Sequence, residues 1–318
     1  MQTTGIGVGF FGNNERVAIG LGARRARLLV GRGNGRVQQV FADSRRLPEA
    51  ALRVGLRGPV INDRDGVVAA LRELVGKAKA AGVLRRTPET VALLVADGAF
   101  KMVVGPIEGG APSRADGDRM ATWLLRELVP VDESEIRADW SMLEATGAEG
   151  SGPTMLSVGG VDAVMAEYEA TVAALGWTVG RLVPWSFAAA AAGRSGGDVA
   201  GGDAGDNAGA DGDLDASAAG RRDLVLCDAD GALGALFQTD GIPRLHRAWR
   251  TPITGEGVAE QLPTLRRYVN DHLETTIGNL WLCGDSAWAA AAAAACELSR
   301  IPTRILSPEA ALCAAIEG

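Results

Sequence analysis

The stretch RVAIGLGARRARLLVGRGNGRV, residues 16–37, holds two apolar runs with a glycine-rich turn between them. Both runs are rich in Val, Ile and Leu, which favour strands. We therefore predict a strand, a tight turn with Gly20 and Gly22, and a second strand that ends at an Asn-Gly hairpin turn. Turns of this shape often bind phosphate through backbone N–H groups, usually beside an acid that manages magnesium. This turn carries no acid.

The same order of parts occurs again in DLVLCDADGALGALFQTDGIPRLHRAW, residues 223–249. Its first turn contains Asp228 and Gly231, and its Asp240-Gly241 pair is typical of a hairpin. A strand–turn–strand unit that occurs twice, followed each time by segments of helical periodicity, predicts a duplicated α/β architecture with two lobes.

The composition agrees with a large α/β core. The chain has 318 residues, of which 47% are hydrophobic and only 5% aromatic, so it can bury a core of two domains or of one bilobed domain. The formal net charge is −7, which argues against nucleic acid as the main partner because binding to phosphate backbones requires a basic surface.

The four cysteines and two histidines lack the spacing of metal ligands. There is no CxxC pair, and we expect no metal site. Reduced thiols fit the cytoplasm, and the N-terminus has neither the basic nor the apolar part of an export signal. No apolar run reaches the roughly 20 residues of a membrane-spanning helix. The cysteines are Cys227, Cys283, Cys296 and Cys313.

Residues 193–220 form a low-complexity segment of Gly, Ala, Asp and Ser. The segment has too little apolar surface to fold, and we predict a flexible surface loop. Its aspartates do not recur at the spacing of a calcium loop, so the loop is favoured over a calcium site.

Four later segments together resemble the PilM-type pilus assembly proteins. In the first, a helix ends at a proline and is followed by an acidic turn and a DW…L strand. In the second, a helix ends at the glycine of GWTVGRLVPWSF, and the strand in this stretch leads into an alanine-rich helix. In the third a GEG turn opens a long helix, and in the fourth WLCGD precedes a final IP turn. The four segments are residues 116–143, 157–192, 247–269 and 279–306.

This resemblance implies an actin-like, duplicated ribonuclease H-like fold of two lobes, with a small inserted α+β subdomain like those of the division protein FtsA and the secretion protein GspL. The implied division of the chain is 1–88 for the first part of the first lobe, 89–176 for the subdomain, 177–192 for the connection, 193–220 for the loop and 221–318 for the second lobe.

The resemblance also implies the remains of a nucleotide site. In actin-like ATPases the first turn carries a magnesium-organising aspartate, and the corresponding position here is Gly20. The second turn keeps Asp228 but lacks the hydroxyl residues that usually follow, and Asp230 adds a charge that repels phosphate. The candidate nucleotide residues are Gly20, Gly22, Asp228, Gly231, Gly284 and Asp285.

Each of these residues also has a purely structural interpretation: a hairpin for the glycines, a turn for Asp228, and a helix cap for Asp285. We expect no hydrolysis, while weak binding of ATP or ADP stays open.

In the PilM family a cleft beside the subdomain binds the N-terminal cytoplasmic tail of a bitopic, PilN-like inner-membrane protein. The resemblance implies a corresponding groove here, in which an extended peptide would dock through apolar pockets and strand edges. Trp123 and Trp140 are candidate anchors, with burial in the core as the alternative for each. The candidate partner-binding residues are Val95, Phe100, Val103, Trp123, Leu124 and Trp140.

The leading hypothesis is a cytoplasmic, non-catalytic scaffold of a type IV pilus or type II secretion assembly, recruited to the inner membrane through its partner. Two alternatives stand beside it. One is an ATP-binding enzyme of the sugar-kinase or actin-like ATPase superfamily, and the other is a polymerising or membrane-bound relative of the division proteins. The acidic C-terminal segment argues against the last, since it offers no basic amphipathic helix.

Overall fold

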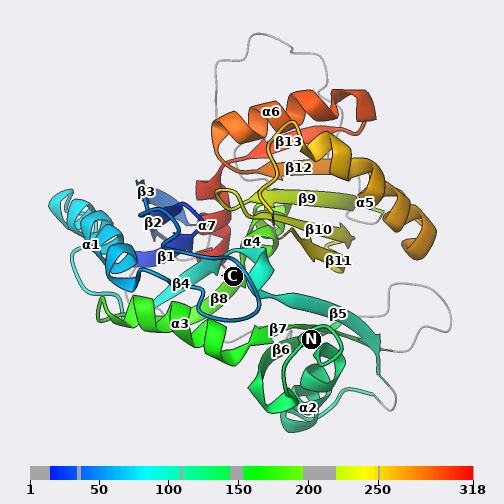
Figure 1. The fold of residues 1–318 in the computed structure, drawn as a ribbon, viewed down its shortest axis with the longest axis horizontal. Coiled ribbons are helices and arrows are strands. Elements are labelled where there is room, and N and C mark those ends of the chain that lie inside the picture. The colour runs from blue at the N-terminus through cyan, green and yellow to red at the C-terminus, as the bar shows by residue number, and fades with distance from the viewer. Residues whose placement is uncertain are drawn as a thin grey trace.

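Two five-stranded sheets of the same strand order form the centre of the fold (Figure 1). The computed structural model describes residues 15–33, 37–107, 110–143, 153–195, 220–249 and 251–317. Residues 196–219, most of the predicted flexible loop, and the Asn-Gly pair of the first stretch lie outside the described residues.

The first sheet has the order β3-β2-β1-β4-β8. β1 and β2 form the predicted antiparallel hairpin, β3 continues it, and β4 and β8 add in parallel to β1. The strands are β1 (Glu15–Leu21), β2 (Arg25–Arg32), β3 (Gln38–Arg46), β4 (Thr90–Val95) and β8 (Thr178–Pro184).

The second sheet repeats this plan in the order β11-β10-β9-β12-β13. β9 and β10 are antiparallel, while β12 and β13 run parallel to β9. At the predicted β10–β11 turn, Asp240 and Gly241 have φ angles of 53° and 77°, as an Asp-Gly hairpin requires. The strands are β9 (Arg222–Asp228), β10 (Leu233–Thr239), β11 (Ile242–Ala248), β12 (Asn279–Cys283) and β13 (Thr303–Leu306).

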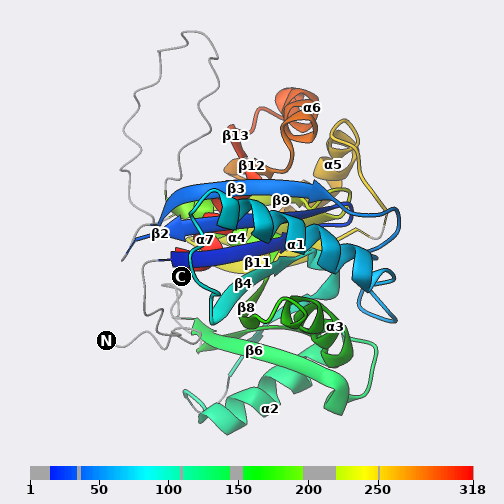
Figure 2. The same cartoon turned by 90° about the vertical axis from the view of Figure 1, so that its left-hand side faces the viewer.

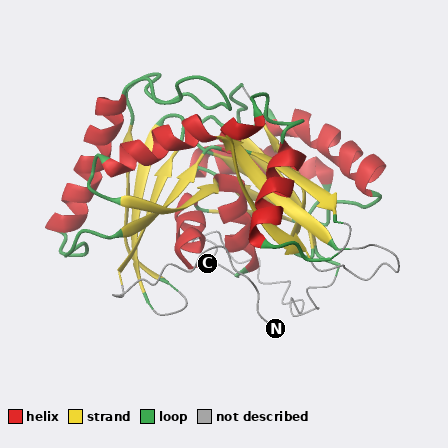
Figure 3. Ribbon diagram, turned by 90° about the horizontal axis from the view of Figure 1, so that it is seen from below, coloured by secondary structure: helices red, strands yellow, loops and turns green. Residues whose placement is uncertain are grey.

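Helices cover both sheets and fill the space between them (Figure 3). One apolar core joins the first sheet to α1 and α3, and another joins the second sheet to α5 and α6. A third core lies between the sheets and contains the side chains of α4 and α7. The helices are α1 (Arg64–Ala80), α3 (Asp162–Ala173), α4 (Trp185–Arg194), α5 (Val258–Leu273), α6 (Ser286–Cys296) and α7 (Pro308–Glu317).

The two central helices exchange lobes. We call the first sheet with α1 and α3 the first lobe, and the second sheet with α5 and α6 the second lobe. α4 follows the first sheet in sequence but contacts β9 and β10 of the second, whereas α7 follows the second sheet and contacts β1, β2 and β4 of the first. The predicted duplicated, two-lobed α/β architecture is confirmed.

A small antiparallel sheet, β5-β7-β6, projects from the first lobe with α2 against it (Figure 2). At the two ends of the expected segment 89–176, β4 pairs with β1 of the first sheet and α3 packs in the core of that sheet. The division of the chain into domains stays a prediction. The elements are β5 (Lys101–Pro106), α2 (Arg114–Leu125), β6 (Ile136–Leu143) and β7 (Thr154–Val161); the short 3-10 helices are η1 (Asp97–Ala99), η2 (Glu133–Glu135) and η3 (Glu297–Ser299).

The docking of α7 between the sheets predicts a strong effect of truncating its buried side chains. Leu312 is fully buried there, and Leu312→Ala should lower the free energy of unfolding by about 2–5 kcal/mol through lost burial and the cavity left behind. Leu298→Ala is the control: its side chain is 96% exposed, and the change should stay within about 0.5 kcal/mol. Urea denaturation followed by tryptophan fluorescence measures both; equal effects would contradict the packing of α7.

Candidate functional site

The turn between β1 and β2 and the turn between β9 and β10 meet directly. Ala23 N–H, in the first turn, donates a hydrogen bond of 2.9 Å to the Ala229 carbonyl oxygen in the second. Beside it, Arg24 Nε donates to the Asp230 carbonyl oxygen at 2.8 Å. The two turns that the resemblance assigns to a nucleotide site are therefore hydrogen-bonded to each other.

A buried ion pair lies behind this contact. The Arg27 guanidinium on β2 binds the Asp230 carboxylate with both terminal nitrogens, and the Nη2–Oδ1 distance is 2.7 Å. The side chains are only 6% and 4% exposed. Burial acts to lower the pKa of Arg27, but the hydrogen bond and the charge of Asp230 outweigh it and raise that pKa above its ordinary value. Bidentate pairing satisfies two otherwise isolated buried charges.

The atoms that surround Gly20 and Gly22 explain why neither position carries a side chain. Gly20 lies within β1 and not in the turn as predicted; the turn is formed by Gly22, Ala23 and Arg24. A Cβ on Gly20 would come within 2.8 Å of the Trp185 ring, and one on Gly22 would overlap the Asp230 carboxylate. A magnesium-binding aspartate at position 20 would therefore need the space that Trp185 fills.

Asp228 lies at the end of β9, where its carboxylate closes the second turn. The Gly231 N–H donates to both of its oxygens, at 2.9 and 3.1 Å. Burial raises the pKa of Asp228 from its ordinary 3.8 to about 6, the hydrogen bond from Gly231 opposes the rise, and the charges of Asp230 and Asp285 add to it. The second turn thus uses its acid to hold its own backbone, with Gly231 at a φ of 101°.

A second polar cluster links the lobes around Asp97, which follows β4. Its carboxylate accepts from Ser186 N–H at 3.2 Å and from Ser186 Oγ, and His246 Nε2 on β11 lies 2.9 Å from Oδ1. The carboxylate thus caps the first turn of α4, where negative charge is favourable. Gly234 on β10 leaves room for it, since a Cβ there would lie 2.7 Å from the Asp97 Cβ.

The third expected nucleotide element is a strand-to-helix turn. Asp285 is the N-cap of α6 and accepts a hydrogen bond of 2.8 Å from Trp288 N–H. A Cβ on Gly284 would lie 2.7 Å from the Trp288 ring. Packing against tryptophan thus accounts for this glycine, as it does for Gly20.

The expected partner-binding residues divide by burial. Val95 and Phe100 lie in the core of the first lobe and present no surface to a partner. Trp123, on α2, is 52% exposed, and the Arg126 guanidinium lies 4.9 Å above its ring. The remaining three are half-buried around the small sheet: Val103, Leu124 and Trp140. Trp140 rests on Gly117, and its indole N–H donates to Asp118 at 2.8 Å.

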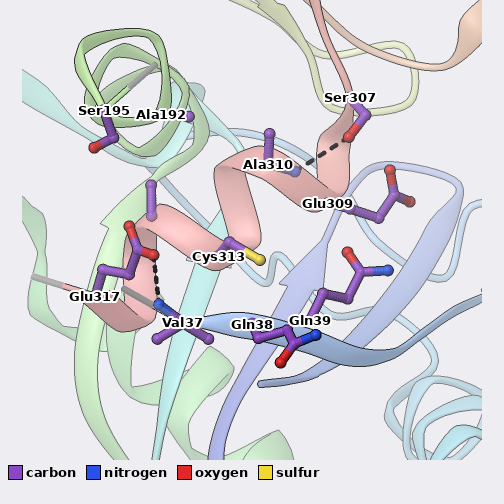
Figure 4. A pocket seen from close by; sticks show the side chains of 11 residues that line it. Val37, Gln38, Gln39, Ala192, Ser195, Ser307, Glu309, Ala310, Cys313 and Glu317 are labelled. Carbon is purple, nitrogen blue, oxygen red and sulfur yellow. Dashed lines mark hydrogen bonds between the residues drawn. The ribbon is translucent and has the colours of Figure 1, made fainter. Parts of the chain in front are cut away.

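A groove of about 450 Å³ lies apart from both clusters, between α7, the end of α4 and the start of β3 (Figure 4). Small and polar side chains line it, among them Ala310, Cys313 and Ser195. The Glu317 carboxylate accepts a hydrogen bond of 2.7 Å from Val37 N–H at its rim. All of the predicted site residues lie in described parts of the chain, and the groove contains none of them.

Sequence reasoning overlooked Arg27, Asp97, Trp185, Ser186 and His246. Arg27 carried a signal, because an arginine between Ala26 and Leu28 interrupts an apolar strand and requires a buried partner. The others come from elements far apart in the sequence and have no local pattern that would group them.

No family model matches the sequence, and no curated protein matches it. Solved structures do. The PilM–PilN type IV pilus biogenesis complex contains a chain that is 13% identical, with a TM-score of 0.68 over 95% of this chain and 97% of that chain.

Two further structures agree. A Bacteroides thetaiotaomicron protein of unknown function with an actin-like ATPase fold is 12% identical, with a TM-score of 0.51 over 95% of this chain and 96% of that one. The cytoplasmic domain of EpsL, an inner-membrane component of the Vibrio cholerae type II secretion system, is 13% identical, with a TM-score of 0.51 over 95% and 94%.

The chain has an actin-like fold. Both the predicted fold class and the structural resemblance to PilM are confirmed by these similarities, which at such low identity concern the fold alone. In the described part of the chain, every helix is too short or too polar to cross a bilayer.

The raised pKa of Asp228 predicts a pH effect on stability. Between about pH 4 and pH 6 the folded chain holds a proton that the unfolded chain releases, so this residue lowers the free energy of unfolding as the pH rises. Asp228→Asn removes the titration but keeps an oxygen for Gly231. The variant should gain stability relative to the native chain from pH 4 to pH 7, by at most about 3 kcal/mol. Denaturant titrations across this range measure the difference; a constant difference would contradict the buried site.

Proposed function

We propose that this chain is a non-catalytic, actin-like scaffold of a type IV pilus or related type II secretion assembly. The scaffold works in the cytoplasm and reaches the inner membrane through a partner. The supporting similarity covers nearly the whole chain: both the pilus complex and the secretion protein align over 95% of it.

The observation that carries the non-catalytic assignment is the 2.9 Å hydrogen bond from Ala23 to Ala229. A magnesium-bound triphosphate needs free backbone N–H groups in both turns and a carboxylate for the metal. Here Ala23 N–H already donates a hydrogen bond to the other turn, and the Asp230 carboxylate is paired with the Arg27 guanidinium. The Asp228 carboxylate accepts from Gly231. The residues do not fit the nucleotide of working actin-like ATPases, which also argues against the sugar-kinase alternative.

The proposed partner is the N-terminal tail of a PilN-like inner-membrane protein. The pilus structure supports this choice, because the chain of similar fold comes from a complex of PilM with PilN. The end of α2 supports the place: Trp123 on the helix and Leu128 in the turn after it are exposed, and Leu124 is half-buried toward the small sheet. A large aromatic side chain with an apolar neighbour is the usual anchor of a peptide interface.

We expect Mg-ATP to leave the stability of the chain unchanged. Ligand binding with a dissociation constant a thousandfold below the ligand concentration would add about 4 kcal/mol to the free energy of unfolding. A thermal shift with millimolar Mg-ATP, compared with Mg²⁺ alone, should therefore show no rise in melting temperature. A rise of several degrees, or steady ATP turnover, would contradict the proposal.

The tail interaction predicts a specific loss on changing Trp123. The probe is a synthetic peptide of the N-terminal cytoplasmic segment of the PilN-like protein from the same organism, titrated by calorimetry. Trp123→Ala should weaken its binding about tenfold or more, while Leu298→Ala, an exposed leucine on η3, should leave it unchanged. If the native chain does not bind the peptide, the proposed partner is wrong; if both variants bind normally, the anchor lies elsewhere.

A further inference from the structure

We propose that the Arg27–Asp230 ion pair is a clamp that holds the two lobes in one fixed arrangement without any nucleotide. The inference rests on inter-lobe contacts alone and is independent of which assembly the chain serves. It concerns what takes the place of the ligand that bridges the lobes in nucleotide-binding members of this fold.

Asp230 directs all three of its oxygens at the opposite lobe. Its carboxylate oxygens bind Arg27 on β2, and its carbonyl oxygen accepts from Arg24 in the β1–β2 turn. Its φ of 58° is left-handed, a conformation that aspartate tolerates better than most residues. The chain therefore adopts an uncommon backbone geometry at the point where it reaches across to the first lobe.

The burial of the pair makes it sensitive to orientation. Both charges are almost fully enclosed, and the Arg27 guanidinium also lies 5.7 Å from the centroid of the Trp185 ring. Trp185 in turn packs on Gly20 and on the core between the sheets. A rotation of one lobe would separate buried opposite charges, and the low local polarity makes that separation unfavourable.

The Asp97 cluster adds a second point of attachment. It joins the end of β4 in the first lobe, the start of α4 and β11 in the second lobe through Asp97, Ser186 and His246. Two attachments on different strands restrict rotation more than one does. Together they keep the two turns in contact, so that the hydrogen bond between Ala23 and Ala229 can form.

The inter-lobe distance tests the clamp directly. Spin labels at Lys79→Cys on α1 and Arg266→Cys on α5 lie on exposed positions of opposite lobes, in the full chain with Cys313→Ser because the other three cysteines are buried. Pulsed electron paramagnetic resonance should give one narrow distance distribution that millimolar Mg-ATP does not change. A second population, or a shift with Mg-ATP, would overturn the proposal.

Three charge variants complete the test. Asp230→Asn keeps the shape and the left-handed tolerance but leaves Arg27 unpaired, and it should broaden the distribution or move it to longer distances. Arg27→Lys keeps a charge without the bidentate geometry and should do so to a smaller extent. If either variant fails to fold, Arg27→Met with Asp230→Asn removes both charges and should also broaden it.

The matched control is Lys77→Met, which breaks an exposed ion pair with Asp43 inside the first lobe; its distribution should equal that of the native chain. If the folded Arg27 and Asp230 variants also keep the native distribution, the pair is not a clamp.

Discussion

Arg27 and Asp230 place opposite charges next to each other where water barely reaches them. This buried ion pair restricts which residues can surround it. Leaving one such charge unpaired is unfavourable by about 3–5 kcal/mol, so neither side chain tolerates loss of the other. Gly22 must lack a Cβ because the carboxylate lies against it. The turn of Asp230 takes a left-handed residue followed by Gly231, and the Asp228 carboxylate holds that turn closed.

The same contacts support the proposal that the chain carries out no nucleotide chemistry. Protein atoms lie directly against three of the glycines that the resemblance to actin-like ATPases assigns to a nucleotide site: Trp185 beside Gly20, Asp230 beside Gly22 and Trp288 beside Gly284. α4 and α7, which each follow one lobe and pack on the sheet of the other, also hold the lobes together.

The sequence was sufficient to predict the duplicated sheets, because both hairpins carry apolar strands with glycine or Asp-Gly turns, and local pattern determines such units. The expectation that Gly20 and Asp230 make the turns unsuitable for a magnesium-bound phosphate stays a prediction. The sequence could not give the contact between the turns, since Arg27 and Asp230 are 203 residues apart. Val95 and Phe100 were misplaced for a related reason: an apolar strand next to a predicted groove has the same pattern whether it faces the groove or the core.

Hydrogen exchange at the Ala23 amide tests the central claim, that protein contacts fill the space between the turns. This N–H lies in a tight turn, where an open cleft would leave it exposed to water and fast to exchange. The hydrogen bond to Ala229 predicts strong protection, equal to that of the neighbouring strand amides and the same with or without Mg-ATP. Fast exchange in the free chain, or protection that appears only when Mg-ATP is added, would contradict the account.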